Sequence, residues 1–194
     1  MIKLEGLSDE RLKELGRRVG EAFCSEGDGI AMILPKDDAV KALEIMTECY
    51  YRAGLLYATG ERMEGLLAYW HKKDKMRLKP LLRMVFRMLR EIRFKSLIKL
   101  AKNADNLYEK IYKKEKDYVL VSMVVVFPEY QGKGYLRKIL ATPFAEAESG
   151  KIPCVLDTDT ETKMKKYEAC GMKLAAKKAT KSGCFLYAME FRPS

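Results

Sequence analysis

The sequence has little of what metal centres, disulfide frameworks and membrane spans require. It holds one histidine in 194 residues, and its five cysteines are odd in number and lack Cys-x-x-Cys spacing. We therefore expect reduced thiols and no bound metal. No apolar run approaches the roughly 20 residues of a membrane-spanning helix, and residues 1–5 lack the apolar core of a signal peptide. Together these absences predict a cytoplasmic protein without a membrane partner.

Positive charge is concentrated in one segment. The formal net charge is +10, and residues 72–116 hold 16 Lys/Arg against 5 Asp/Glu, a balance of +11 that leaves the remainder near neutrality. Basic segments bind anionic partners or form solvated surfaces. The rest of the composition is typical of a globular chain, and the length favours one domain, residues 1–194, with enough residues for a core.

A strand, a glycine-bearing turn and a helix follow one another after residue 117. Residues 118–127 read YVLVSMVVVF, a run without charge and rich in β-branched side chains, which predicts a buried strand. Gly132 and Gly134 come next, and apolar residues then repeat at helical spacing from Leu136 to Ala147. Free N–H groups at a helix start suit a phosphate, and glycine lets the backbone approach one closely. Glycine turns also occur for structural reasons alone.

Neither of two common nucleotide motifs is present in this turn. The chain has no Gly-x-x-x-x-Gly-Lys-Ser/Thr, and Arg137 stands where a dinucleotide fingerprint would have its third glycine.

The remaining periodicity predicts alternating strands and helices. Strands are expected at 2–6, 55–59, 63–70, 153–157, 172–177 and 185–191, and helices at 9–26, 38–53, 80–116 (more than one) and 160–170. Glycine-containing turns are expected at 27–29 and 181–183. In the first basic helix, Leu81, Leu82, Val85, Met88, Leu89 and Ile92 share one face, and Arg83, Arg87 and Arg90 line the other. Leu97, Ile98, Leu107 and Ile111 are expected to point inward.

Two segments resemble the GNAT superfamily of N-acyltransferases. Val126-Phe127-Pro128 followed by Gln131-Gly132-Lys133-Gly134-Tyr135-Leu136 is similar to its acetyl-CoA signature, Gln/Arg-x-x-Gly-x-Gly/Ala after a strand that ends in Val-x-Pro. Residues 167–172, YEACGM, resemble its Tyr-Glu-x-x-Gly-Phe segment. Leu136 departs from the usual Gly or Ala, and Met172 from the usual aromatic residue.

The resemblance covers nearly the whole chain and implies an α/β (α+β) fold. Its centre would be a mixed, mostly antiparallel sheet of about six to seven strands flanked by helices, GNAT-like. Residues 72–117 would be a basic helical insertion between strands 3 and 4, similar to that of puromycin-type resistance enzymes.

The resemblance also implies a function: transfer of acetyl from acetyl-CoA to a primary amine of a small molecule by direct attack on the thioester. The CoA-binding residues would be Val124, Val125, Val126, Gln131, Gly132, Lys133, Gly134, Tyr135 and Leu136. The family separates its fourth and fifth strands beside them, usually with a bulge. Tyr167 takes the position of the general acid for the CoA sulfur, since a phenol is protonated at neutral pH. Packing beneath the final sheet is its alternative role.

The general base and the acceptor site are less determined. Residues 119–127 contain no carboxylate, so His71, at the end of the third strand, becomes a candidate base because its ordinary pKa suits the task. A packing histidine and a water chain to solvent are alternatives. Trp70, Asp157 and Thr158 are candidates for contact with the acceptor, although Asp157 can also serve as a helix cap.

Two other functions stay open, namely a non-catalytic CoA-binding sensor and a protein or peptide N-acetyltransferase. The basic helix could be a solvated face, a lid over the acceptor pocket or a surface for an acidic partner. We do not expect nucleic acid, since the aromatic interleaving and reading modules of such proteins are absent. The resemblance leaves open a homodimer through the last strands.

Overall fold

The computed structural model describes residues 1–25, 29–74, 76–104, 106–180 and 183–193. The turns expected at 27–29 and 181–183 therefore lie partly outside the described residues.

A seven-stranded sheet forms the centre, in the order β1-β2-β3-β4-β5-β7-β6. β4 and β5 are parallel, and every other neighbouring pair is antiparallel. The predicted mixed, mostly antiparallel sheet is thus confirmed. Its strands are β1 (Ile2–Lys3), β2 (Leu56–Ala58), β3 (Gly65–His71), β4 (Val119–Val126), β5 (Cys154–Thr158), β6 (Lys173–Ala179) and β7 (Phe185–Phe191).

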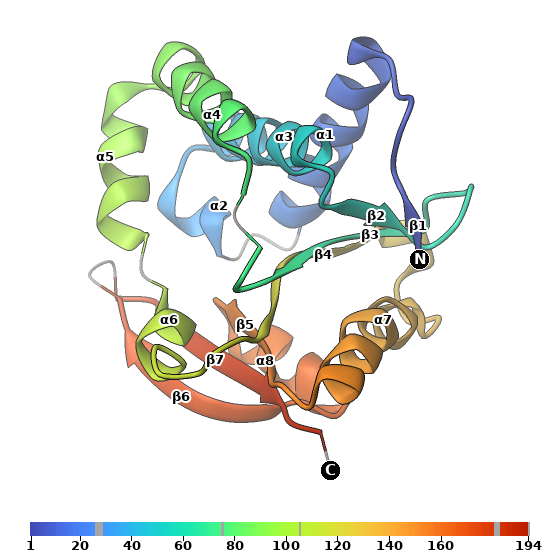
Figure 1. Cartoon of the computed structure of the whole chain (residues 1–194). Coiled ribbons are helices and arrows are strands. Elements are labelled where there is room, and N and C mark those ends of the chain that lie inside the picture. The colour runs from blue at the N-terminus through green and yellow to red at the C-terminus, as the bar shows by residue number, and fades with distance from the viewer. Residues whose placement is uncertain (26–28, 75, 105, 181–182, 194) are drawn as a thin grey trace.

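Helices cover both faces of the sheet (Figure 1). α1 (Asp9–Cys24) and α3 (Lys36–Ala53) pack on one face through Leu15, Val19 and Tyr50. α7 (Tyr135–Gly150) and α8 (Glu161–Glu168) cover the other through Ile139 and Tyr167. The short α2 (Ile30–Ile33) and the 3-10 turn η1 (Pro128–Tyr130) lie in connections.

Local chemistry explains where the first helices begin and how closely they cross. Ser8 caps α1, because its side chain accepts a hydrogen bond from the Arg11 N–H at 3.3 Å. α1 and α3 approach so closely that a Cβ on Gly20 would lie 2.7 Å from the Val40 carbonyl oxygen. Only glycine fits this crossing, which holds α3 over the sheet.

Three helices separate β3 from β4, in the segment predicted as an insertion: α4 (Leu78–Glu91), α5 (Phe94–Asn103) and α6 (Leu107–Ile111). Their orientation corrects the sequence-based expectation. Arg87 points inward and is only 16% exposed, whereas Leu82 and Leu89 are 59% and 64% exposed. Ile98 and Ile111, expected to point inward, are also exposed.

Buried carboxylates of α3 cause this orientation. Glu44 and Glu48 are buried on the side of α3 that faces α4. Arg87 donates to both, and Arg83 donates to Glu48 at 2.8 Å. A poorly paired buried carboxylate is costly, so Arg87 turns inward and the apolar stripe faces out. The expectation of a solvated arginine face is therefore wrong for Arg87, while Arg90 and Arg83, whose side chain is 54% exposed, face solvent as expected.

Candidate active site

β4 and β5 pair along only part of their length. The parallel ladder joins Val119 to Cys154 and Leu120 to Val155, and ends there. Beyond Leu120, the strands diverge, and residues 121–126 of β4 and 156–158 of β5 line opposite walls of a cavity. Strand positions beyond the ladder can offer N–H and C=O groups to an extended ligand.

A bulge lies in β4 where this divergence begins. Ala68 pairs with Met123 and Tyr69 with Val121, so Ser122 has no partner in β3. Its side chain is exposed to the cavity, and its hydroxyl lies 2.8 Å from the hydroxyl of Tyr50. Bulges redirect strands beside active sites, and this one turns the end of β4 away from β5.

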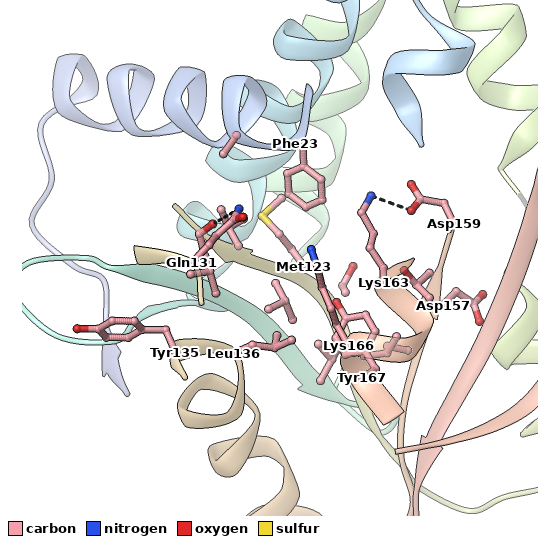
Figure 2. Close-up of a pocket in the computed structure, with 18 of the residues that line it drawn as sticks. Phe23, Met123, Gln131, Tyr135, Leu136, Asp157, Asp159, Lys163, Lys166 and Tyr167 are labelled. Carbon is pink, nitrogen blue, oxygen red and sulfur yellow. Dashed lines mark hydrogen bonds and ion pairs between the residues drawn. The ribbon is translucent and has the colours of Figure 1, made fainter. Parts of the chain in front are cut away.

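The cavity between these strands measures about 630 Å³, within the range of small-molecule sites. Figure 2 shows Phe23 of α1 above it and Leu136 and Tyr167 below it. Its side-chain walls are mostly apolar along β4 and polar towards α8. The lining residues used below are Phe23, Ser122, Val124, Val125, Val126, Gln131, Gly132, Gly134, Tyr135, Leu136, Asp157, Thr158, Asp159, Lys163, Lys166 and Tyr167.

The turn after β4 forms one end of the cavity. Gly132 and Gly134 have φ angles of 73° and 79°, which L side chains rarely adopt, and no atom lies within 4 Å of the position that a Cβ would take on either. Gly134 is the N-cap of α7, so the first N–H groups of a 16-residue helix begin here. Gln131 Nε2 donates to the Val126 carbonyl at 3.3 Å and ties the turn to β4.

This turn fits the diphosphate of CoA. The open glycines give an anion access to the backbone, and the helix start supplies partial positive charge. The departure at Leu136 leaves the cradle accessible, because its side chain lies along the floor towards Tyr167 (Figure 2). Lys133, predicted to bind CoA, is not among the lining residues, and its ammonium group donates to the Glu129 carbonyl at 2.9 Å.

Tyr167 lies on α8 at the floor of the cavity, opposite β4 (Figure 2). Burial raises the pKa of its phenol well above the ordinary value, and the negative charge of Asp159 raises it further. The side chain is therefore a neutral hydroxyl throughout the physiological pH range, able to donate a proton.

Polar residues gather at the β5 end of the cavity. Lys163 donates to Asp159 at 2.8 Å. Asp157 accepts hydrogen bonds from the backbone N–H groups of Leu107 and Tyr108, the closest at 2.7 Å. Asp157 thus caps α6 and connects the insertion to the cavity. Among the residues that the structure describes, Asp157 and Asp159 are the carboxylates that line the cavity.

Several lining residues escaped the sequence analysis. Lys163 lies four residues before Tyr167 on α8, a spacing that puts both on one helical face and could have identified it. Ser122 is the one hydroxyl residue inside the apolar run of β4, which was a usable signal. Phe23 comes from a helix distant in sequence, and nothing in its surroundings pointed here.

Two more predicted site residues, His71 and Trp70, lie outside the cavity lining. His71 is held on the α7 side of the sheet, with Nδ1 3.0 Å from Asp117 Oδ2 and Nε2 3.1 Å from Glu146 Oε2. Trp70 packs against Tyr50, with ring centroids 5.8 Å apart. The structure thus brings Asp157 and Thr158 to the cavity, but not His71 or Trp70.

Solved structures share this architecture. An arylalkylamine N-acetyltransferase from Aedes aegypti superimposes with a TM-score of 0.62 at 12% identity, covering 98% of both chains. An N-acetyltransferase from Staphylococcus aureus gives 0.56 at 14% identity, covering 94% of this chain and 96% of the other. A GNAT-family acetyltransferase from Desulfovibrio desulfuricans gives 0.55 at 14% identity, covering 97% and 95%. No protein-family model and no curated protein sequence matches the chain.

The chain therefore has the GNAT acetyltransferase fold. Within the described residues, no group of His, Cys, Asp or Glu side chains is arranged to hold a metal ion. No helix in the same ranges has the length and apolar character to cross a membrane.

Proposed function

We propose that the protein is an N-acetyltransferase that moves acetyl from acetyl-CoA to a primary amine of a small molecule. The observation that carries the proposal is the cavity between β4 and β5, which begins at the open glycine turn and reaches Tyr167. This arrangement offers a diphosphate cradle, a strand edge and a proton donor in one continuous space.

The strand edge would hold the pantetheine arm. Residues 121–126 of β4 lie beyond the β5 ladder, so their peptide groups can bind an extended chain as a further strand would. A backbone N–H of this segment can polarise the thioester oxygen. When bound, acetyl-CoA supplies the acetyl group as an activated thioester.

Tyr167 would supply the proton for the leaving sulfur. In the transfer, the amine nitrogen forms a bond to the acetyl carbon, the carbon–sulfur bond breaks, and nitrogen loses a proton. The Tyr167 hydroxyl donates to the sulfur and regains its proton from solvent. A phenol with a raised pKa keeps its proton until negative charge develops beside it.

The acceptor would enter at the polar end of the cavity. Asp157 and Asp159 can attract an ammonium group, and Thr158 lies between them in the sequence. The ammonium group becomes a nucleophilic amine when it loses a proton, which solvent can accept. A cavity of about 630 Å³ has room for a small amine beside the thioester, which supports the small-molecule acceptor.

Thiol release from acetyl-CoA, measured across a panel of amino acids, polyamines, arylalkylamines and short peptides, tests the proposal. Release that depends on a small amine supports it. Release with peptides alone would point to a peptide N-acetyltransferase. Thermal stabilisation by acetyl-CoA without release for any amine would point to the CoA-binding sensor.

A further inference from the structure

The outward side of α4 is apolar. Leu78, Leu82, Phe86 and Leu89 are 67%, 59%, 64% and 64% exposed, and Val85 lies among them at 46%. Their spacing of three and four residues places them on one helical stripe. Soluble monomers rarely leave so many large apolar side chains together in water.

The next helix continues the same pattern. On α5, Phe94 is 73% exposed and Ile98 is 39% exposed, at a spacing of four. We call the seven side chains the outer apolar face: Leu78, Leu82, Val85, Phe86, Leu89, Phe94 and Ile98. Figure 1 shows α4 and α5 at the periphery of the fold, with α4 on the opposite side of the molecule from β6 and β7. The face therefore projects from the molecule.

Basic residues border this face. Lys79, Arg83 and Arg90 follow one flank of α4, and Lys95, Lys99 and Lys102 follow the corresponding flank of α5, again at spacings of three, four and seven. Residues 76–104 carry nine Lys/Arg and a single acidic residue, Glu91. Glu91 is engaged by Arg87, with Oε1 2.8 Å from Nε. The border of the outer apolar face is thus strongly positive.

Buried ion pairs prevent the helices from turning their apolar side inward. Arg87 is bound by Glu44, Glu48 and Glu91. Arg93 donates to Asp38 of α3 at 2.8 Å and anchors the start of α5. Rotating the two helices would remove their arginines from these buried carboxylates and leave Glu44 and Glu48 with only Lys41 and Arg52 of α3 as partners, which is costly. The exposure is therefore a fixed property of the fold.

We propose that the outer apolar face binds the surface of an anionic phospholipid membrane. Helices with Phe and Leu on one side and Lys/Arg beside it lie in the headgroup region, with the apolar side chains inserted and the cations near lipid phosphates. The sequence-based expectation of no membrane partner rested on the lack of a spanning run, and surface binding needs none. The proposal is independent of the acetyltransferase reaction.

Charge and shape distinguish the possible binding partners of the outer apolar face. A second copy of the chain would bring another border of like charge against the first, in a protein with a net charge of +10. A protein segment would need a groove, whereas these side chains project at exposed fractions up to 73%. A negatively charged, deformable surface satisfies both the cations and the projecting phenyl and leucyl groups.

Vesicle sedimentation tests the proposal with the full chain at about 0.1 M salt, where electrostatic attraction is still felt. We expect partition to vesicles containing phosphatidylserine to exceed partition to pure phosphatidylcholine by about ten-fold or more. Equal partition to the two, or none to either, would overturn the proposal.

Substitutions on and off the face identify the binding surface. Phe86→Ser with Leu89→Ser should lower partition more than about ten-fold, whereas Leu174→Ser, an exposed leucine of edge strand β6, should leave it unchanged. Lys95→Glu should lower partition by about five-fold or more, and Lys173→Glu on β6 should have much less effect.

Equal loss of vesicle binding in Leu174→Ser and in Phe86→Ser with Leu89→Ser would contradict the assignment. So would self-association of the protein without lipid, if Phe86→Ser with Leu89→Ser abolished it. The second result would make the face an interface between copies of this chain.

Discussion

The guanidinium of Arg87 in α4 hydrogen-bonds to the buried carboxylate of Glu48 in α3, and so joins the insertion to the helical layer of the fold. Arg52 and Arg83 also donate to Glu48, at 2.6 and 2.8 Å. Burial opposes ionisation of Glu48, but these hydrogen bonds and the charge of Arg87 keep its pKa below the ordinary value. The cluster is thus ionised and anchors α4.

Replacing Arg87 with methionine should destabilise the protein strongly. The variant keeps much of the packing but removes the cation between Glu44, Glu48 and Glu91, and we expect a loss of about 3 kcal/mol in the free energy of unfolding. Arg90→Met is the control, because Arg90 is exposed and should lose less than about 0.5 kcal/mol. Urea denaturation measures both, and equal midpoints would refute the anchoring role.

Acid should weaken the same cluster. The hydrogen bond from Arg87 lowers the pKa of Glu91 from 4.5 to about 2. Because the folded pKa is depressed, its stabilisation is fully present above the unfolded pKa and is lost as pH falls from about 4.5 towards 2, with an upper bound of about 3 kcal/mol. Urea midpoints between pH 7 and 3 should fall, and Glu91→Gln should flatten this dependence. If the urea midpoints of the wild type and of Glu91→Gln depended on pH identically, Glu91 would not be a source of the acid sensitivity.

Removing the Tyr167 hydroxyl should slow turnover without weakening acetyl-CoA binding. We expect Tyr167→Phe to lower kcat by about 100-fold while KM for acetyl-CoA changes little, since general-acid catalysis contributes about that much. His71→Gln is the comparison, because His71 lies outside the cavity lining and should keep kcat within about three-fold. Thiol-release kinetics measure both. The reverse ranking would return His71 to the mechanism and remove Tyr167.

The glycine turn allows a matched test of the diphosphate cradle. Gly134 and Gly6 have φ angles of 79° and 71°, and neither has an atom within 4 Å of an added Cβ. Valine at either position should cost similar backbone strain, about 1–2 kcal/mol. Only Gly134→Val should also lose the rise in Tm caused by acetyl-CoA. A full ligand-induced shift in Gly134→Val would place the diphosphate elsewhere.

Much of the sheet could be predicted from the sequence because its signals are local. The uncharged run at 118–127 forms β4, and the helical period from Leu136 forms α7 after a glycine turn. The boundaries of β7 match the prediction residue for residue. The contact between Gln131 and Val126 follows from the same short segment.

The rest depends on partners that are distant in sequence. Arg87 turns inward only because Glu44 and Glu48 are buried opposite it, so amphipathicity alone predicted the wrong exposed side for α4. His71 was placed at the correct strand end, but whether its ring faces the cavity or α7 depends on register, since neighbouring strand residues point to opposite faces. Asp157 was predicted to contact the acceptor or to cap a helix, and the helix that it caps, α6, lies 50 residues earlier in the sequence.

The β4–β5 ladder has two paired positions, as few as the edge pair β1–β2, so the middle of the sheet contains a weak join. Two residue pairs connect the half formed by β1 to β4 with the half formed by β5 to β7. A pantetheine arm bound along β4 would contact both halves of the sheet and stabilise the join between them. Amide hydrogen exchange in β4 beyond Leu120 should therefore slow when acetyl-CoA is present.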